Sequence, residues 1–396
     1  MTKVARYTSA SQHELEHERL WSTVWWLAGH RDRVREPGEL FVATMGRREI
    51  VIVNDEGTLR AYHNVCPHRG HPLCSAATGR VKQLTCPYHR WRYTLDGRCA
   101  AIPDEASFPA GTREGTRLSE VRVDVRAGLV WVCLAADGPS LETFLGPVLS
   151  WLDGYGLEAW RLDGEVTVPL SANWKASTDV HNEAYHLHAL HPEAMPIVDD
   201  TDAQIETSGW HARIRVPMGR SSGRLSTEGV HPQLKAFLDD HGVSPVEGED
   251  TREAYLRALR DRQEATWAAL SDSQLVDNHM IYVFPNVQLN LHRDHAMVFR
   301  HRPVVPRRCS FDQLNLVRER SGAAPAPRPA TADDPIIGPV TGADLKTAEA
   351  LQRGYDGGGI EELTLSSQEA VIAHMHHGLE VFLEGGGGAS PPQPQK

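Results

Sequence analysis

The chain contains the stretch Cys66-Pro-His68-Arg-Gly70 and, with seventeen residues between His68 and the next cysteine, the stretch Cys86-Pro-Tyr-His89. Both Cys–His pairs follow strand-like segments, so we expect each of them on a loop. Two thiolates and two imidazoles suit either a tetrahedral zinc ion or an iron–sulfur centre. The two pairs by themselves leave both kinds of site open.

Short segments with a hydrophobic period of two surround these pairs, which is typical of β-strands. Asp55-Glu-Gly57 and Asp96-Gly97 are hairpin signals between such segments. The pattern predicts a small all-β domain of about a hundred residues. Its expected strands include residues 41–44, 49–53, 58–62, 91–93, 121–125 and 129–134.

The composition restricts the partners and the compartment of the protein. Of 396 residues, 40% are hydrophobic and 23% are charged, as in soluble globular proteins, and the net charge is −11. Nucleic acids and anionic membrane surfaces are therefore not expected partners. No apolar stretch has the length of a signal peptide or a membrane span, so we expect a cytoplasmic protein. In that compartment the six cysteines are expected to be free thiols or metal ligands rather than disulfides.

A second stretch rich in ionisable groups runs from Asn173 to His191 and reads NWKASTDVHNEAYHLHALH. On a helix, Glu183 and His186 share a face at positions i and i+3. His191 would lie about 140° round the axis from His186, so it joins them only if the helix ends or bulges first. Pro192 favours such an end, because proline disfavours the helical conformation of the preceding residue. A solvated helix face, a zinc site and a redox iron site remain open for this stretch.

The residues around the two Cys–His pairs resemble the oxygenase branch of the Rieske 2Fe-2S family. The resemblance rests on the two pairs themselves and on the motifs Trp91-Arg-Tyr93 and Asp96-Gly-Arg98 that follow them. It implies that Cys66 and Cys86 hold one iron and that His68 and His89 hold the other. One position departs from the family pattern: most oxygenase-type sequences have glycine directly after the second histidine, where this chain has Arg90.

The resemblance continues into the second stretch, where Asn173-Trp-Lys and Glu183-x-x-His186-x-x-x-x-His191 look like the catalytic domain of Rieske non-haem iron oxygenases. In that family, two histidines and a distant carboxylate hold Fe(II) and leave positions for O₂. The resemblance therefore implies that His186 and His191 are iron ligands. For the carboxylate we expect Glu369, on a final helix predicted over residues 363–384. Gln368, Glu361 and Glu362 are the alternatives.

Glu183 matches the position of the family's bridging carboxylate, which is usually an aspartate. That residue joins a Rieske histidine of one subunit to an iron-ligand histidine of the next and gives the electrons a path. Asp179 competes with Glu183 for this role. His181 and His188 match no family ligand and are expected to be bystanders.

The resemblance implies an α+β fold, in which a β-rich Rieske domain accompanies a catalytic domain whose antiparallel sheet wraps around a long helix. We expect an N-terminal helical segment packing on the catalytic domain, the Rieske domain, the catalytic iron domain and a disordered tail. Their predicted limits are 1–39, 40–138, 139–384 and 385–396. Helices are predicted over residues 11–30 and 253–270, a long loop over 217–250 and an irregular connection over 319–343. Phe284, Asn286, Gln288, Asn290 and His292 alternate on a predicted strand that could line a pocket.

The resemblance implies an oxidoreductase that uses O₂ to hydroxylate a small organic, aromatic-type substrate. The reaction is either monohydroxylation or cis-dihydroxylation. The family's electrons come from a separate reductase, with or without a ferredoxin, and its common assembly is a homotrimer. O- or N-demethylation is the alternative reaction. From other classes, an electron-transfer protein with an inactive second site and a zinc hydrolase remain. Against a zinc hydrolase, the chain lacks the His-Glu-x-x-His order that places a base beside zinc.

Overall fold

The first of two lobes is a seven-stranded antiparallel sheet that carries a three-stranded extension. In this computed structural model, which describes residues 2–75, 77–226, 229–385 and 390–391, the sheet has the order β2-β11-β10-β5-β4-β3-β6. The extension is β7-β8-β9. The strands are β2 (Trp26–His30), β3 (Glu39–Met45), β4 (Arg48–Asp55), β5 (Thr58–His63), β6 (Thr78–Arg80), β7 (Leu84–Thr85), β8 (Arg92–Tyr93), β9 (Cys99–Ala101), β10 (Glu120–Arg126) and β11 (Leu129–Cys133).

The second lobe is an eight-stranded sheet with the order β13-β14-β15-β16-β17-β18-β12-β19, antiparallel except where β19 joins β12. Helix α6 packs on β17 and β18 and against α11, and α12 packs on β13 and β14. The strands are β12 (Arg161–Leu170), β13 (Gln204–Ser208), β14 (His211–Val216), β15 (Asn278–Val283), β16 (Val287–Leu291), β17 (His295–Val305), β18 (Arg308–Val317) and β19 (Arg328–Pro329).

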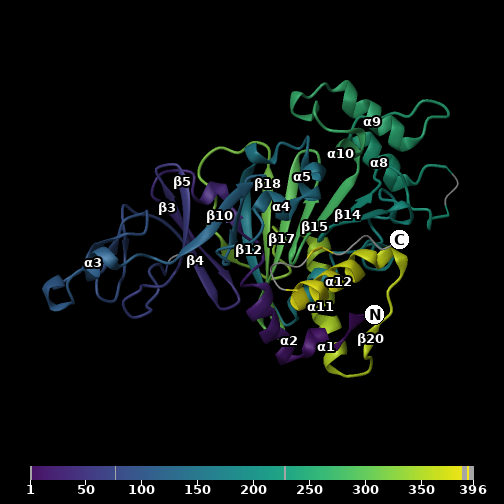
Figure 1. Ribbon diagram of the computed structural model, residues 1–396. Coiled ribbons are helices and arrows are strands. Elements are labelled where there is room, and N and C mark those ends of the chain that lie inside the picture. The colour runs from purple at the N-terminus through teal and green to yellow at the C-terminus, as the bar shows by residue number, and fades with distance from the viewer. Residues whose placement is uncertain (1, 76, 227–228, 386–389, 392–396) are drawn as a thin grey trace.

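Helices surround the second sheet, among them the N-terminal helices α1 and α2 and the C-terminal helix α12 (Figure 1). The short strands β1 (Thr2–Lys3) and β20 (Glu362–Leu363) pair with each other there. The α-helices are α1 (Ala5–Thr8), α2 (Ala10–Leu15), α3 (Thr112–Gly115), α4 (Leu141–Leu145), α5 (Pro147–Leu152), α6 (Trp174–Asp179), α7 (Leu187–Leu190), α8 (Pro232–Asp240), α9 (Thr251–Asp261), α10 (Asp272–Val276), α11 (Pro339–Asp356) and α12 (Ala370–Gly385).

The α+β prediction and the curled antiparallel sheet around a long helix are confirmed. The predicted helix over residues 11–30 is wrong beyond its first part. Helix α2 passes into a π-helical turn, Glu16–Leu20, and residues 26–30 form strand β2. All five residues of β2 are buried, and such a run does not distinguish a buried strand from a helix by periodicity.

Two helices were missed in regions where the sequence shows no sustained hydrophobic period. Helix α8 lies within the predicted loop 217–250, and α11 begins within the predicted irregular connection 319–343. The predicted domain limits stay predictions. The predicted tail falls largely on residues outside the described ones, and Gly385 ends α12.

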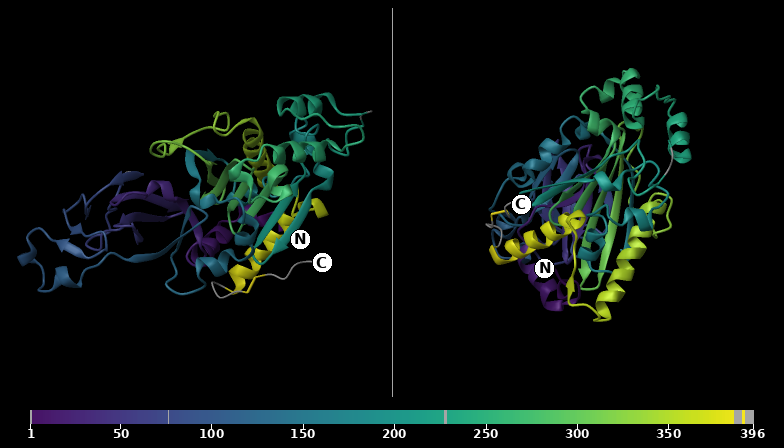
Figure 2. Two further views of the ribbon diagram at one scale, coloured as in Figure 1. Left: turned by 90° about the horizontal axis from the view of Figure 1, so that it is seen from above. Right: turned by 90° about the vertical axis from the view of Figure 1, so that its right-hand side faces the viewer.

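The part of the first lobe that carries the Cys–His pairs has a core of its own. This core contains both cysteines together with Trp91 and Tyr93, whereas the tryptophans of residues 21–26 pack into the core shared with the catalytic sheet. Figures 1 and 2 show this part, in blue, projecting away from the eight-stranded sheet. Among the described residues, none of the helices combines the length and the apolar composition that a membrane span requires.

Candidate iron–sulfur and mononuclear iron sites

The two Cys–His loops have the same backbone design. In the first, the amide of Gly70 donates to the carbonyl of Cys66 (2.9 Å), and in the second the amide of Arg90 donates to the carbonyl of Cys86 (3.0 Å). Gly70 and Arg90 both have positive φ angles, of 78° and 63°. Arg90 therefore keeps the turn that glycine makes elsewhere, at the steric cost of a left-handed side-chain-bearing residue.

The four predicted cluster ligands come together at the tips of these loops. Cys66 and Cys86 are buried, while the rings of His68 and His89 lie closer to solvent with their centroids 4.6 Å apart. The Nδ1 atom of His68 is buried and has no hydrogen-bond partner among the described residues. Burial also raises the pKa of the Cys66 thiol, a cost that a bound cation would relieve. This donor set fits a Rieske cluster, with thiolates inside and imidazoles outside.

Aromatic side chains contact one outer and one inner ligand of the predicted cluster. The ring of His68 stacks on Trp91 with an interplanar angle of 2° and a centroid distance of 4.7 Å. The hydroxyl of Tyr93 lies 3.2 Å from Sγ of Cys66, within reach of a hydrogen bond to the sulfur. Hydrogen bonds to cluster sulfur and burial are the means by which a protein tunes such a centre.

The stretch from Asn173 to His191 forms two short helices with a break between them. Such a break was the condition for His191 to join His186. Asn173 caps α6 by accepting a hydrogen bond from the amide of Lys175 (2.9 Å), and α6 ends at Asp179. His186 precedes α7 as its N-cap residue, and His191 follows it as its C-cap residue with a non-helical φ of −128°. The two histidines can therefore face one point, which a continuous helix would prevent.

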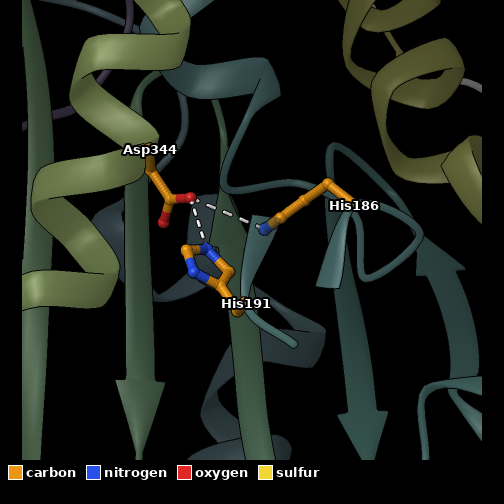
Figure 3. A group of neighbouring side chains, drawn as sticks. All are labelled: His186, His191 and Asp344. Carbon is orange, nitrogen blue, oxygen red and sulfur yellow. Dashed lines mark hydrogen bonds and ion pairs between the residues drawn. The ribbon is translucent and has the colours of Figure 1, made fainter. Parts of the chain in front are cut away.

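His186 and His191 meet the carboxylate of Asp344, which lies on α11 (Figure 3). Nε2 of His191 lies 2.8 Å from Oδ1 of Asp344, and Nε2 of His186 lies 3.6 Å from the same oxygen. The three donor atoms all lie within 4.8 Å of one another, and no other such group of His, Cys, Asp or Glu occurs among the described residues. Two imidazoles and one carboxylate on one side of a cavity fit the facial triad of non-haem Fe(II).

The structure does not bring Glu369, the predicted carboxylate ligand, into this group, and Asp344 lies there instead. Glu369 is used locally, because its side chain accepts a hydrogen bond from the amide of Ser366 (2.8 Å) and caps the turn before α12. Asp344 is 5% exposed and points with Ala348, Gln352 and Tyr355 to the buried side of α11. Their spacing of four, four and three residues is helical, and an aspartate on such a face was the available signal.

Glu183 orients His186 within its own chain. Its Oε1 lies 2.7 Å from Nδ1 of His186, and its Oε2 accepts a hydrogen bond from the backbone amide of the same residue (2.9 Å). This leaves Nε2 of His186 directed at Asp344, as expected of a carboxylate that supports a ligand histidine. Asp179, the competing residue, is bonded instead to the hydroxyl of Tyr7 (2.5 Å) and lies 3.3 Å from Nε2 of His376.

The remaining histidines of the stretch stay outside the ligand group. Nδ1 of His181 lies 2.9 Å from the carbonyl of Ser177, and its Nε2 is 3.8 Å from Oδ2 of Asp344. Nδ1 of His188 lies 2.6 Å from the carbonyl of Tyr185 in an exposed position.

A cavity of about 360 Å³ opens beside the three donor atoms. Gln288, Asn290 and His292 line it as predicted, whereas Phe284 packs on Trp210 and the amide of Asn286 donates to the carbonyl of His301. The other lining residues are mostly apolar: Val180, Leu187, Ala194, Val198, Val216, Met280, Leu289, Met297, Phe299, Ile337, Pro339 and Val340. Volume and lining are those of a small-molecule site.

Comparison with known proteins gives two family matches. Residues 157–385 match the ring hydroxylating alpha subunit (catalytic domain), and residues 24–119 match the Rieske 2Fe-2S domain. These two matches account for most of the chain, and they contain all the candidate ligands described above.

The curated relatives have 28% to 31% sequence identity to this chain over the aligned residues. The glycine betaine monooxygenase oxygenase subunit of Chromohalobacter salexigens is 28% identical over 306 residues, 76% of this chain and 67% of that protein. The alignment covers only 56% of the Pseudomonas aeruginosa protein of the same name, or about half of its length. The biphenyl 2,3-dioxygenase subunit alpha of Rhodococcus jostii is 31% identical over 189 residues, 46% of this chain and 41% of that protein.

Solved structures share the fold at low sequence identity. A quaternary ammonium Rieske monooxygenase in complex with its substrate L-carnitine has a TM-score of 0.71 at 20% identity, over 95% of this chain and 93% of that chain. Naphthalene 1,2-dioxygenase from Rhodococcus sp., bound to indole, has a TM-score of 0.67 at 18% identity, over 92% and 85% of the two chains.

Proposed function

Since the chain belongs to the family of ring-hydroxylating alpha subunits and carries a Rieske 2Fe-2S domain, we propose that it is an oxygenase that hydroxylates a small organic substrate with O₂. The observation that carries the proposal is the approach of His186, His191 and Asp344 beside an apolar cavity. These residues would hold Fe(II), and Cys66, His68, Cys86 and His89 would hold the Rieske cluster. When bound, the ferrous ion activates O₂ and the cluster supplies electrons.

The side chains of the catalytic lobe have distinct tasks in this proposal. Glu183 fixes the imidazole of His186 through two hydrogen bonds, so that the ring does not rotate away from the metal position. The apolar walls exclude water and hold the substrate next to the donor atoms.

We further propose that electrons reach this site from the Rieske domain of a neighbouring copy in a homotrimer. The blue part of the first lobe projects away from the catalytic sheet of its own chain (Figure 2). Glu183, His186 and Asp344 also line a second cavity, of about 440 Å³. The role of Glu183 as the bridge to a partner's Rieske histidine rests on this position. A separate reductase or ferredoxin would supply the electrons.

Demethylation is the second candidate reaction, because two kinds of relatives are glycine betaine and carnitine monooxygenase subunits. Both reactions start with insertion of one oxygen atom, so the ligand set does not separate them. The product does: a methyl group oxidised to a carbinol leaves as formaldehyde, whereas a hydroxylated ring keeps the oxygen.

The experiment is to incubate the cluster- and iron-loaded protein with a reductase, ¹⁸O₂ and a panel of arenes, aromatic acids, methyl ethers and quaternary amines. We expect substrate-dependent O₂ uptake and ¹⁸O in a hydroxylated product. Release of formaldehyde together with the demethylated compound would assign the demethylation instead. If O₂ uptake depends on no compound of the panel and the mononuclear iron is absent, the oxygenase proposal fails.

A further inference from the structure

The cavity beside the donor atoms has a polar end away from them, formed by β15 and β16. Gln288 lies near the iron end, because its amide donates to the carbonyl of Thr178 and to Oδ1 of Asn182, both at 3.0 Å. Asn290 and His292 follow it by two and four residues, so they lie roughly 7 and 13 Å farther along the strand direction. Asn278 pairs with Val216 on β14 at the same end.

Two side chains at this end have buried hydrogen-bonding groups without a partner among the described residues. The Oδ1 atoms of Asn278 and Asn290 are buried and have no partner among the described residues. His292 is half-buried beside them, and its ring stacks on that of His295 with a centroid distance of 4.5 Å. Buried polar groups are normally paired, so this concentration indicates that a ligand or water supplies the partners.

The polar end carries no charge. Burial lowers the pKa of His292 to about 3, so the imidazole is neutral at pH 7 and offers one donor and one acceptor. Each amide likewise offers both. Of the described residues lining the cavity none is lysine or arginine, and the acids among them, Glu183 and Asp344, belong to the iron end. An anionic substrate would find no counter-charge here.

The cavity also lacks the groups that bind a quaternary ammonium ion. Such a cation is recognised by the faces of several aromatic rings, which replace part of its hydration. Phe299 is the one Phe, Tyr or Trp among the described lining residues. Neither carboxylate at the iron end is free to pair with a cation, because Asp344 would bind Fe(II) and both oxygens of Glu183 are bonded to His186.

We infer that the substrate of this cavity is an uncharged molecule with an apolar body beside the iron ligands and a hydrogen-bonding group held by Asn278, Asn290 and His292. This inference rests on the proposed function and narrows it. It separates the chain from relatives named for glycine betaine and carnitine, and it makes the three side chains specificity-determining residues.

Two pairs of shape-matched probes test the inference by calorimetric binding to the loaded full-length protein. The first pair, tert-butylbenzene and phenyltrimethylammonium, differs in charge. The second pair, 2-naphthol and naphthalene, differs in one hydroxyl group. We expect the neutral member of the first pair to bind at least tenfold more tightly. We expect 2-naphthol to bind roughly five- to tenfold more tightly than naphthalene, the effect of about one net hydrogen bond.

The double substitution Asn278→Leu and Asn290→Leu should remove the hydroxyl preference while keeping or improving the binding of naphthalene. Gln233→Leu, an amide change on the exposed face of α8, is the matched control and should leave both ratios unchanged. Equal or tighter binding of the ammonium probe would overturn the inference. So would a hydroxyl preference that survives in the double variant, or a lack of binding by both naphthalene probes.

Iron content of the same preparations separates this failure from that of the proposed function. A protein with mononuclear iron that prefers the cation contradicts the inference about the substrate alone. A protein that binds the neutral probes but takes up no mononuclear iron contradicts the proposed oxygenase and leaves the character of the cavity as inferred.

Discussion

Asp344 and Glu369 differ in what the surrounding chain lets each carboxylate do. Glu369 follows Ser366 by three residues and satisfies the free amide at the start of a turn, a common role for glutamate at that position. Asp344 has a short side chain on the buried side of a long helix, close to Nε2 of His191. The sequence pattern favoured Glu369 because it lies on the expected last helix. Only the packing of α11 on α6 places a carboxylate beside both histidines.

At the residue scale, Glu183→Gln should separate metal binding from electron delivery. The three iron ligands remain, so the iron content should not change. A neutral amide holds the Nδ1–H group of His186 less strongly than a carboxylate does, and we expect the single-turnover oxidation of the reduced cluster to slow by roughly 10- to 100-fold. Stopped-flow absorbance of the cluster measures this rate. Glu361→Gln, an exposed change, is the control, and an unchanged rate in Glu183→Gln would contradict the role of Glu183.

At the scale of elements, the two cluster loops can be compared by exchanging the residue types at positions 70 and 90. Arg90 has a φ of 63°, where a side chain is strained, and Gly70 has a φ of 78° with nothing within 4 Å of an added Cβ. We expect Arg90→Gly to raise the free energy of unfolding of the loaded protein by about 0.5–1 kcal/mol, since the relieved strain exceeds the entropy cost of glycine.

The reverse change, Gly70→Arg, should lower that free energy by about 1–2 kcal/mol, because it introduces the same strain into the first loop. Denaturation followed by the visible absorbance of the cluster measures both variants. A loss of stability in Arg90→Gly would show that the arginine side chain stabilises the loop by contacts that outweigh its backbone strain.

The hydrophobic patterns of the strands and helices explain which of them could be predicted from the sequence. The strands of both sheets carry clear alternation or short apolar runs, and β3, β4 and β16 fall where they were expected. Helix α11 is built from small and polar residues after Pro339, and its buried side includes Gly342 and Gln352, so its hydrophobic period is weak. Its burial depends on tertiary packing against α6, so the pattern contains only a weak signal for Asp344, the carboxylate beside the two histidines.

At the scale of the whole molecule, the N-terminal segment is bonded directly to the helix that leads into the iron site. Nζ of Lys175 lies 2.6 Å from Oε1 of Glu16, and both side chains are at most 1% exposed. The indole of Trp174 donates to the other oxygen of Glu16 (2.9 Å). Burial lowers the pKa of Lys175, and the charge of Glu16 acts against this shift.

Glu16→Gln should therefore destabilise the protein by about 3–5 kcal/mol, since it leaves Lys175 buried without a counter-charge. Adding Lys175→Met should recover most of this loss, because the unpaired charge is then removed as well. Chemical denaturation of the single and double variants measures both. If the single variant lost under 1 kcal/mol, the pair would not hold the N-terminal segment in place.

The assembly can be examined by mixing two inactive variants. Cys86→Ser should lose the cluster and Asp344→Asn the mononuclear iron, so neither alone should turn over. If electrons pass between neighbouring copies, co-expressed mixed assemblies should regain a substantial fraction of the substrate-dependent O₂ uptake. No recovery in assemblies shown by mass spectrometry to contain both variants would place the transfer within one chain.

The most direct measurement of the central claim is the iron and acid-labile sulfide content of three preparations. The loaded protein should hold about three iron and two sulfide per chain, two iron in the cluster and one at His186, His191 and Asp344. Asp344→Asn should hold about two iron with an unchanged cluster spectrum, and Glu369→Gln about three. Two iron in the unaltered protein, or loss of the third iron in Glu369→Gln but not in Asp344→Asn, would contradict the account.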